Sequence, residues 1–159
     1  SMHGDALLAS SALDALRDSL FPLATLVTPN LHEVRLLVDI DVVDAASQRA
    51  AARALHALGP RWALVKGGHL PSAEHSPDLL YDGTDFLEFP GPRVATGDDH
   101  GAGDTLAAAS AAALAHGLSV PDAVAFAKRW VTECLRAAYP LGQGHGPVSP
   151  LFRLGLGAS

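Results

Sequence analysis

Apolar residues in the first half of the chain follow two kinds of pattern. Leucines recur at helical spacing within residues 5–20, which predicts a helix that ends near Pro22. A second helical stripe predicts a helix over residues 44–58. The runs 24–27 and 62–66 are short and continuously apolar, as is typical of strands buried in a sheet. The chain therefore begins by alternating helices with strands.

Polar and proline-containing breaks separate these elements. Proline stops the first strand at Thr28-Pro29-Asn30, and Asn30 with Glu33 has the spacing of a capping box. We expect a short helix from there to about Val38. Gly59-Pro60 ends the longer helix that follows.

The second half contains a hairpin and two further helices. Asp82-Gly83 between apolar runs is a strong hairpin signal, whereas the polar segment 71–77 is expected to be a mobile loop. A glycine-rich loop at residues 101–104 leads into a helix through His116. Ser119-Val-Pro-Asp122 has the pattern of another helix start, and that helix is expected to reach about Tyr139.

Strands that alternate with helices indicate an α/β layered domain with a mostly parallel sheet. The 159 residues have the length of one ordinary domain, and we expect a single domain over residues 1–159.

Composition excludes several classes of protein. Apolar residues make up 48% and charged residues 18%, which is a globular composition and not a disordered one. The net charge of −6, with scattered Lys and Arg, argues against a nucleic-acid partner. Cys134 is the only cysteine, so no intrachain disulfide and no cysteine-based zinc site can form. No apolar run approaches the ~20 residues that span a bilayer, and the N-terminal residues do not resemble a signal peptide. We expect a cytoplasmic protein without a membrane partner.

The loop Gly101-Ala102-Gly103-Asp104 is the strongest candidate for chemistry. Glycines allow close backbone approach to a ligand, and free N–H groups at the start of the following helix favour an anion. Asp104 is unusual there, because a carboxylate repels a bound phosphate. It has two interpretations, a helix-capping residue or a general base beside an anion site.

Other polar breaks supply complementary groups. Residues 28–33 and 66–69 follow the two predicted strands, and ligands bind beyond the carboxyl ends of strands in open α/β sheets. Together with 101–104 and 142–146, these breaks offer a cation, metal-organising polar groups, an anion site and a base. Those are the parts that phosphoryl transfer requires.

The same motifs resemble the hydroxymethylpyrimidine/phosphomethylpyrimidine kinases of thiamine biosynthesis. These enzymes belong to the ribokinase-like superfamily, in which pyridoxal kinases are close relatives. The resemblance rests on Thr28-Pro-Asn-Leu-His-Glu33, Val65-Lys-Gly-Gly-His69, His100-Gly-Ala-Gly-Asp-Thr-Leu106 and Gly144-His-Gly-Pro-Val148. It implies a three-layer αβα fold with a mostly parallel sheet.

Two departures from the family pattern matter. The kinase subfamily usually has Cys at the position of Asp104, whereas pyridoxal kinases and the wider superfamily have Asp. The sequence also resembles only the C-terminal part of the family, and the first βαβ units, which carry much of the substrate pocket, are missing. The sequence thus corresponds to the nucleotide- and phosphate-binding portion.

The resemblance implies a role for each motif residue. Asp104 would be the general base, and the N–H groups of Ala102, Gly103 and Asp104 would hold the transferring phosphoryl group. Lys66 would neutralise ATP phosphates, while Asn30 and Glu33 would organise Mg²⁺ through water. The implied site residues are catalytic Asp104, Gly101, Ala102 and Gly103, ATP-binding Lys66, Asn30 and Gly144, and metal-organising Glu33 and Asn30.

The implied activity is ATP-dependent phosphorylation of hydroxymethylpyrimidine or its phosphate, with ATP and Mg²⁺ as cofactors. The alternatives are a pyridoxal kinase and a catalytically silent nucleotide-binding domain. We expect a small-molecule substrate. Missing strands would expose a sheet edge, so we also expect either a homo-oligomer or a complementing N-terminal segment.

Overall fold

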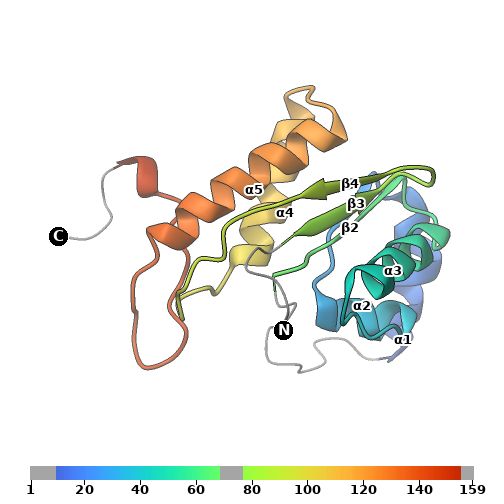
Figure 1. Cartoon of the computed structure of the whole chain (residues 1–159), viewed down its shortest axis with the longest axis horizontal. Helices are drawn as coiled ribbons and strands as arrows, with labels where there is room; N and C mark the ends of the chain where they lie inside the picture. The colour runs from blue at the N-terminus through green and yellow to red at the C-terminus, as the bar shows by residue number, and fades with distance from the viewer. Residues whose placement is uncertain (1–9, 69–76, 155–159) are drawn as a thin grey trace. The chain divides into compact units, whose positions relative to one another are not determined.

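The structure, a computed structural model, describes residues 10–68 and 77–154 (Figure 1). Contacts along the chain group into two compact units, one up to Pro90 and one from Gly91, and each unit is described by itself below. The expectation of a single domain stays a prediction.

The described part of the first unit contains three helices, two short helical turns and four strands. They are α1 (Ser10–Ala15), a π-helical turn (Leu16–Leu20), a 3₁₀ turn (Phe21–Leu23), β1 (Leu26–Val27), α2 (Leu31–Val38), α3 (Ala45–Ala57), β2 (Trp62–Val65), β3 (Asp78–Tyr81) and β4 (Phe86–Phe89). Each element predicted for this region is present. The first helix is described only from Ser10, so residues 5–9 of that prediction lie outside the described residues.

Helices α2 and α3 both begin with a reciprocal capping box. The Asn30 side chain accepts a hydrogen bond from the Glu33 amide, and Glu33 accepts one from the Asn30 amide. Asp44 and Ser47 make the same pair of bonds at the start of α3. The hydrogen bond from the Ser47 side chain lowers the pKa of the exposed Asp44 carboxyl. The predicted start of α2 is confirmed.

The four described strands form a mixed sheet in the order β1-β2-β3-β4. Strands β1 and β2 are parallel, whereas β2–β3 and β3–β4 are antiparallel. The prediction of a mostly parallel sheet is therefore wrong for the described strands. The hairpin accounts for one of the two antiparallel pairs, because Asp82-Gly83 reverses the chain between β3 and β4. Gly83 adopts a φ of 100°, and the Asp82 carboxylate accepts the amides of Thr84 and Asp85.

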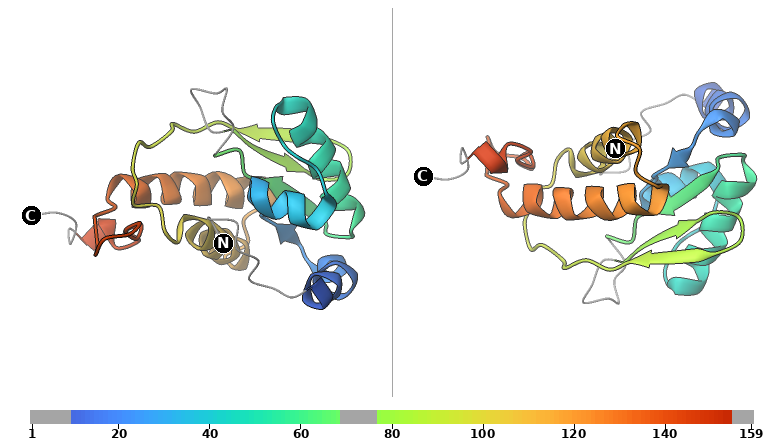
Figure 2. Two further views of the ribbon diagram at one scale, coloured as in Figure 1. Left: turned by 90° about the horizontal axis from the view of Figure 1, so that it is seen from below. Right: turned by 90° about the horizontal axis from the view of Figure 1, so that it is seen from above.

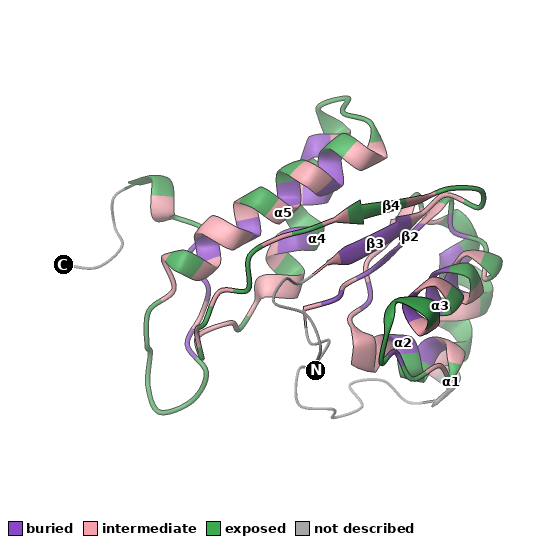
Figure 3. Cartoon of the chain, in the orientation of Figure 1, coloured by how far each residue is buried: buried purple, intermediate pink, exposed green. Residues whose placement is uncertain are grey.

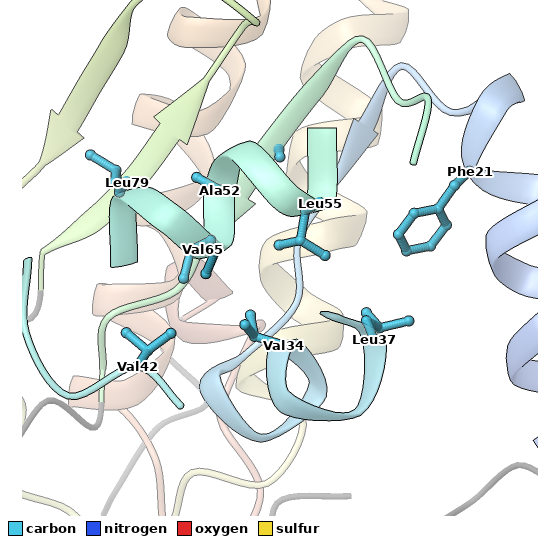
Figure 4. Packing of buried hydrophobic residues seen from close by; sticks show 10 residues of the cluster. Phe21, Val34, Leu37, Val42, Ala52, Leu55, Val65 and Leu79 are labelled. Atoms are coloured by element: carbon cyan, nitrogen blue, oxygen red, sulfur yellow. The ribbon is translucent and has the colours of Figure 1, made fainter. Parts of the chain in front are cut away.

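The core of the first unit lies between α2, α3 and one face of the sheet. Figure 4 shows Leu55 of α3 and Val34 of α2 close to Val65 of β2, and all three side chains are fully buried. Leu64 and Leu80 pair across β2 and β3 and are also fully buried, although they point to the other face. Both faces of the two central strands are thus buried, as their continuous apolar runs predicted. In Figure 3, β4 is largely exposed.

The second unit is built on a pair of packed helices, α4 (Ala102–Ala115) and α5 (Val120–Arg136), followed by a 3₁₀ turn (Phe152–Leu154). Figure 2 shows α4 and α5 side by side from two directions. Helix α4 ends one residue before the predicted His116, and Gly117 follows at a φ of 86°. The Ser119 hydroxyl caps α5 by accepting the Asp122 amide, but α5 ends at Arg136, before the predicted Tyr139.

One face of α5 packs inward and the other carries an aromatic cluster. Trp130 stacks on Phe126 and contacts Phe152 edge-on, with the Arg153 guanidinium over its ring. Cys134, on the inward face, is a free and buried thiol, and burial raises its pKa. Among the residues that the structure describes, no helix is both long and apolar enough to cross a membrane.

Candidate functional site

The carboxyl ends of β1 and β2 meet at one edge of the sheet. Parallel neighbours end at the same edge, so the segments that follow Val27 and Val65 are adjacent. The Lys66 amide donates a hydrogen bond to the Pro29 carbonyl at 3.1 Å. The structure therefore joins the predicted lysine motif to the Thr-Pro-Asn motif.

The capping box of α2 places two oxygen-bearing side chains beside this junction. Glu33 Oε2 lies 2.7 Å from the Asn30 amide, and Asn30 Oδ1 lies 2.8 Å from the Glu33 amide. Within the described part of the chain, the second carboxylate oxygen of Glu33 makes no hydrogen bond.

The side-chain oxygens of Asn30 and Glu33 are suited to holding Mg²⁺ through its water ligands. Carboxylate and amide oxygens suit Mg²⁺, which keeps several waters and usually takes only one or two carboxylates from the protein. Residues 10–68 and 77–154 contain no group of three acidic, His or Cys side chains that could enclose a metal. The donor set thus fits an ion held through water and phosphate, and does not fit an all-protein cage.

The turn after β2 is held by two buried polar side chains that the sequence analysis did not identify. Gln48 Nε2 donates to the carbonyls of Val65 and Pro77 at 3.2 and 3.1 Å, and Asp78 Oδ1 accepts the Gly67 amide at 2.8 Å. Both side chains are 4% exposed. A sequence signal exists for Gln48, because it is the polar member of an otherwise apolar buried stripe on α3.

In the second unit, the start of α4 presents free amides. Gly101, with a φ of 84°, occupies the position before the helix. The Ala102 amide donates to the Asp99 carbonyl, and the Thr105 amide donates to Gly101. Among the described residues, the amides of Gly103 and Asp104 have no acceptor. Two of the three predicted donors are therefore available to an anion, and that of Ala102 is engaged.

Asp104 lies in the first turn of α4 with an exposed side chain. In the described part of the chain, no side chain makes a capping hydrogen bond at this helix start. Asp104 thus does not cap α4 through a hydrogen bond. A carboxylate in the first turn of a helix is nevertheless favoured by the helix dipole. The carboxylate is accessible to a ligand, as a general base must be.

A second glycine-rich segment pairs with the residues before α4. His100 donates its amide to the Gly146 carbonyl and accepts the Val148 amide, and Asp98 Oδ1 accepts the Gly146 amide at 2.8 Å. His145 Nδ1 lies 2.8 Å from the Gly97 carbonyl, so this nitrogen carries the proton. Residues 145–148 are therefore fixed directly beside the start of α4.

Glycines in this pairing have different structural requirements. A Cβ added to Gly146 would overlap Asp98 Oδ1 and the Tyr139 carbonyl, so this position requires glycine. Gly144 is exposed, and a Cβ there would meet nothing within 4 Å. Its predicted contribution to an adenine site remains a prediction.

The structure therefore assembles the predicted residues in two groups. Lys66, Asn30 and Glu33 gather at the sheet edge of the first unit. Gly101–Asp104 and the segment around Gly144 gather at the start of α4 in the second unit.

Comparison with known proteins identifies the family. The sequence profile described as phosphomethylpyrimidine kinase matches residues 1–149. The chain belongs to the phosphomethylpyrimidine kinase family. A hydroxymethylpyrimidine/phosphomethylpyrimidine kinase of Mycobacterium tuberculosis is 77% identical over 97% of this chain, and one of Streptomyces coelicolor is 52% identical over 98%. The chain spans 56% and 57% of the length of these two relatives.

Two solved structures with a similar fold are pyridoxal kinases. An ADP complex of Bacillus subtilis pyridoxal kinase has a TM-score of 0.87 and 35% identity, covering 93% of this chain and 58% of that one. Staphylococcus aureus pyridoxal kinase with AMP-PCP and pyridoxal has a TM-score of 0.86 and 31% identity, covering 92% and 55%. The α/β, ribokinase-like fold class is confirmed.

Proposed function

We propose that this chain provides the ATP- and phosphate-binding part of a hydroxymethylpyrimidine/phosphomethylpyrimidine kinase. The reaction is transfer of the ATP γ-phosphoryl group to the hydroxymethyl group of the pyrimidine or of its phosphate. The observation that carries the proposal is the start of α4, where an exposed carboxylate lies beside two amides that have no acceptor among the described residues. The names of the 77% and 52% identical relatives support the substrate class.

The start of α4 would perform the chemical step. The Gly103 and Asp104 amides stabilise charge on the transferring phosphoryl group, and preorganised donors of this kind are typically worth ~3–4 kcal/mol each. The Asp104 carboxylate accepts the proton of the attacking hydroxyl, a role that typically contributes about 10²–10⁴-fold in rate. Glycine at position 101 lets the backbone enter α4 at a positive φ without strain.

The sheet edge of the first unit would bind the nucleotide phosphates. The Lys66 ammonium neutralises phosphate oxygens, while Asn30 and Glu33 orient the water shell of Mg²⁺. When bound, Mg²⁺ would supply positive charge that neutralises the phosphates. We assign Gly144 to the surroundings of the adenine, because its segment is fixed beside the start of α4.

Pyridoxal kinase is the second candidate activity. Asp104 favours it, because the chain resembles pyridoxal kinases at this position. The similarity to pyridoxal kinase structures at 31–35% identity is a further observation in its favour. The 77% identity to a hydroxymethylpyrimidine/phosphomethylpyrimidine kinase is stronger support than these two observations.

A nucleotide-binding segment that is inactive by itself is the third candidate, since the chain spans only part of its relatives. We propose a homo-oligomer or a complementing N-terminal segment as the partner that completes the sheet. The described sheet ends at β1, which pairs only with β2 there. A free, buried Cys134 fits a reducing compartment, and we propose the cytoplasm.

A phosphorylation assay separates the three candidates. The chain is incubated with ATP and Mg²⁺, and with either hydroxymethylpyrimidine or pyridoxal. Turnover with the pyrimidine supports the main proposal, and preference for pyridoxal supports the second. ADP binding without turnover of either substrate supports the third, whereas absence of ADP binding contradicts all three.

A further inference from the structure

We propose that Gln48 and Asp78 are positioning residues that hold Lys66 in place for the phosphates of the nucleotide. This inference rests on the function proposed for Lys66. It assigns a role to two side chains that lie on other elements and have no place in the motif itself.

Both side chains bond to the backbone on either side of Lys66. Gln48, on α3, donates to the carbonyl of Val65, the residue before the lysine. Asp78, at the start of β3, accepts the amide of Gly67, the residue after it. The amide of Lys66 itself bonds to Pro29. Three successive residues are thus fixed by α3, by β3 and by the loop that precedes α2.

Burial makes these bonds a rigid support. Gln48 and Asp78 are each 4% exposed, so their polar groups cannot exchange their protein partners for water. Breaking one such bond leaves a buried polar group unsatisfied, which costs more than the bond itself contributes. A buried carboxylate or amide is costly unless it is hydrogen-bonded, and Gln48 and Asp78 meet that condition through their bonds to the turn around Lys66.

Packing at Gly67 shows how little room the turn has. Gly67 is buried, and an added Cβ would overlap the Pro77 carbonyl oxygen, the same atom that accepts a bond from Gln48. The turn that begins at Lys66 therefore has one position against Pro77. The side chain of Lys66 therefore starts from a fixed Cα. This lowers the entropic cost of orienting the long, flexible lysine side chain toward a phosphate.

The test compares five variants of the whole chain, of which the fifth, Lys66→Met, is described last. Gln48→Met removes both donated bonds at similar volume, and Asp78→Ala removes the acceptor. Asp78→Asn keeps a carbonyl oxygen for the Gly67 amide and serves as the conservative rescue. Leu55→Ala is the matched control, because Leu55 lies on α3 and is fully buried but makes no bond to the turn.

Two readouts are measured for each variant, namely ADP affinity by calorimetry and hydrogen exchange at the Lys66 and Gly67 amides. We expect Gln48→Met and Asp78→Ala to weaken ADP binding roughly fivefold to tenfold, as for loss of one or two well-placed hydrogen bonds. They should also accelerate exchange at both amides. Asp78→Asn should stay within about twofold of the parent in affinity. Leu55→Ala should change neither readout beyond its global effect on stability.

Lys66→Met separates failure of this inference from failure of the proposed function. If Lys66→Met weakens ADP binding while Gln48→Met and Asp78→Ala do not, the positioning role is wrong and the role of Lys66 stands. If Lys66→Met has no effect on ADP binding, the function proposed for Lys66 is wrong. Equal losses in Leu55→Ala and Gln48→Met would reduce the effect to general destabilisation and overturn the inference.

Discussion

The capping box at Asn30 and Glu33 offers a way to separate helix capping from metal organisation. Asn30→Ala removes the acceptor that lies 2.8 Å from the Glu33 amide. Loss of such a cap costs about 1 kcal/mol, within a range of ~0.5–2. For a chain of this size, that corresponds to a fall of roughly 2–4 °C in Tm.

Glu33→Gln tests the metal role with little loss of capping. Glutamine keeps a carbonyl oxygen that can accept the Asn30 amide, which lies 2.7 Å from the carboxylate in the parent. Only the charge is lost, and its interaction with the start of α2 is worth about 0.3–1 kcal/mol. We therefore expect Glu33→Gln to retain most of the stability and to lose most of the Mg²⁺ dependence of ADP binding.

The assay combines urea unfolding with ADP titrations over a range of Mg²⁺ concentrations. Asp44→Ala is the matched control, because Asp44 forms the same kind of capping box at α3 and belongs to no proposed site. It should lower stability and leave the Mg²⁺ dependence unchanged. Unchanged Mg²⁺ dependence in Glu33→Gln would refute the metal role and leave only a helix cap.

The remaining predictions concern α4, its neighbouring segment and the two cores. Asp104→Asn should lower the rate of phosphoryl transfer by about 10²–10⁴-fold while retaining ADP binding, as measured by single-turnover assays and calorimetry. Unchanged turnover would remove the general-base role. Gly146→Ala should displace Asp98 and accelerate amide exchange at His100, because the added Cβ overlaps its neighbours. Native-like exchange at His100 would contradict this. Leu55→Ala should lower the free energy of unfolding in urea by about 2–5 kcal/mol, as is usual for a fully buried leucine. A loss below about 1 kcal/mol would show that neighbouring side chains fill the cavity. Burial raises the pKa of the Cys134 thiol, so an aromatic disulfide reagent should react only after unfolding. The neutral thiol is favoured in the folded state, so its contribution to stability is complete below the pKa of the unfolded thiol and is lost as pH rises through the higher pKa of the folded thiol. Rapid labelling of the native protein would contradict the burial.

Local signals in the sequence predicted the elements well, and the α4 loop shows why. Glycine spacing and the start of an apolar helix locate Gly101–Asp104 without any knowledge of the fold. The sequence does not show that the Ala102 amide is already bonded to Asp99, since this depends on how the loop turns. The same holds for Asp98, whose bond to Gly146 joins segments nearly fifty residues apart.

Sheet direction was harder to predict than element type. Alternation of helices and strands favoured parallel strands, yet the described sheet has one parallel pair and two antiparallel ones. The Asp82-Gly83 turn already required β3 and β4 to be antiparallel. The direction of β3 relative to β2 depends on the connection between them, and its polar residues carry no periodic signal. The sequence marks Gln48 as a polar residue on an apolar stripe. It does not predict that Gln48 donates hydrogen bonds to the carbonyls of Val65 and Pro77.

The distribution of the two tryptophans has a practical consequence. Trp62 lies in β2 of the first unit, and Trp130 lies in α5 of the second, stacked on Phe126. Each unit therefore has its own intrinsic fluorophore, and replacing either one with phenylalanine leaves a protein that emits from the other unit alone. Coincident urea midpoints for the two single-tryptophan proteins would show that the units unfold as one cooperative domain. Separate midpoints would assign a stability to each.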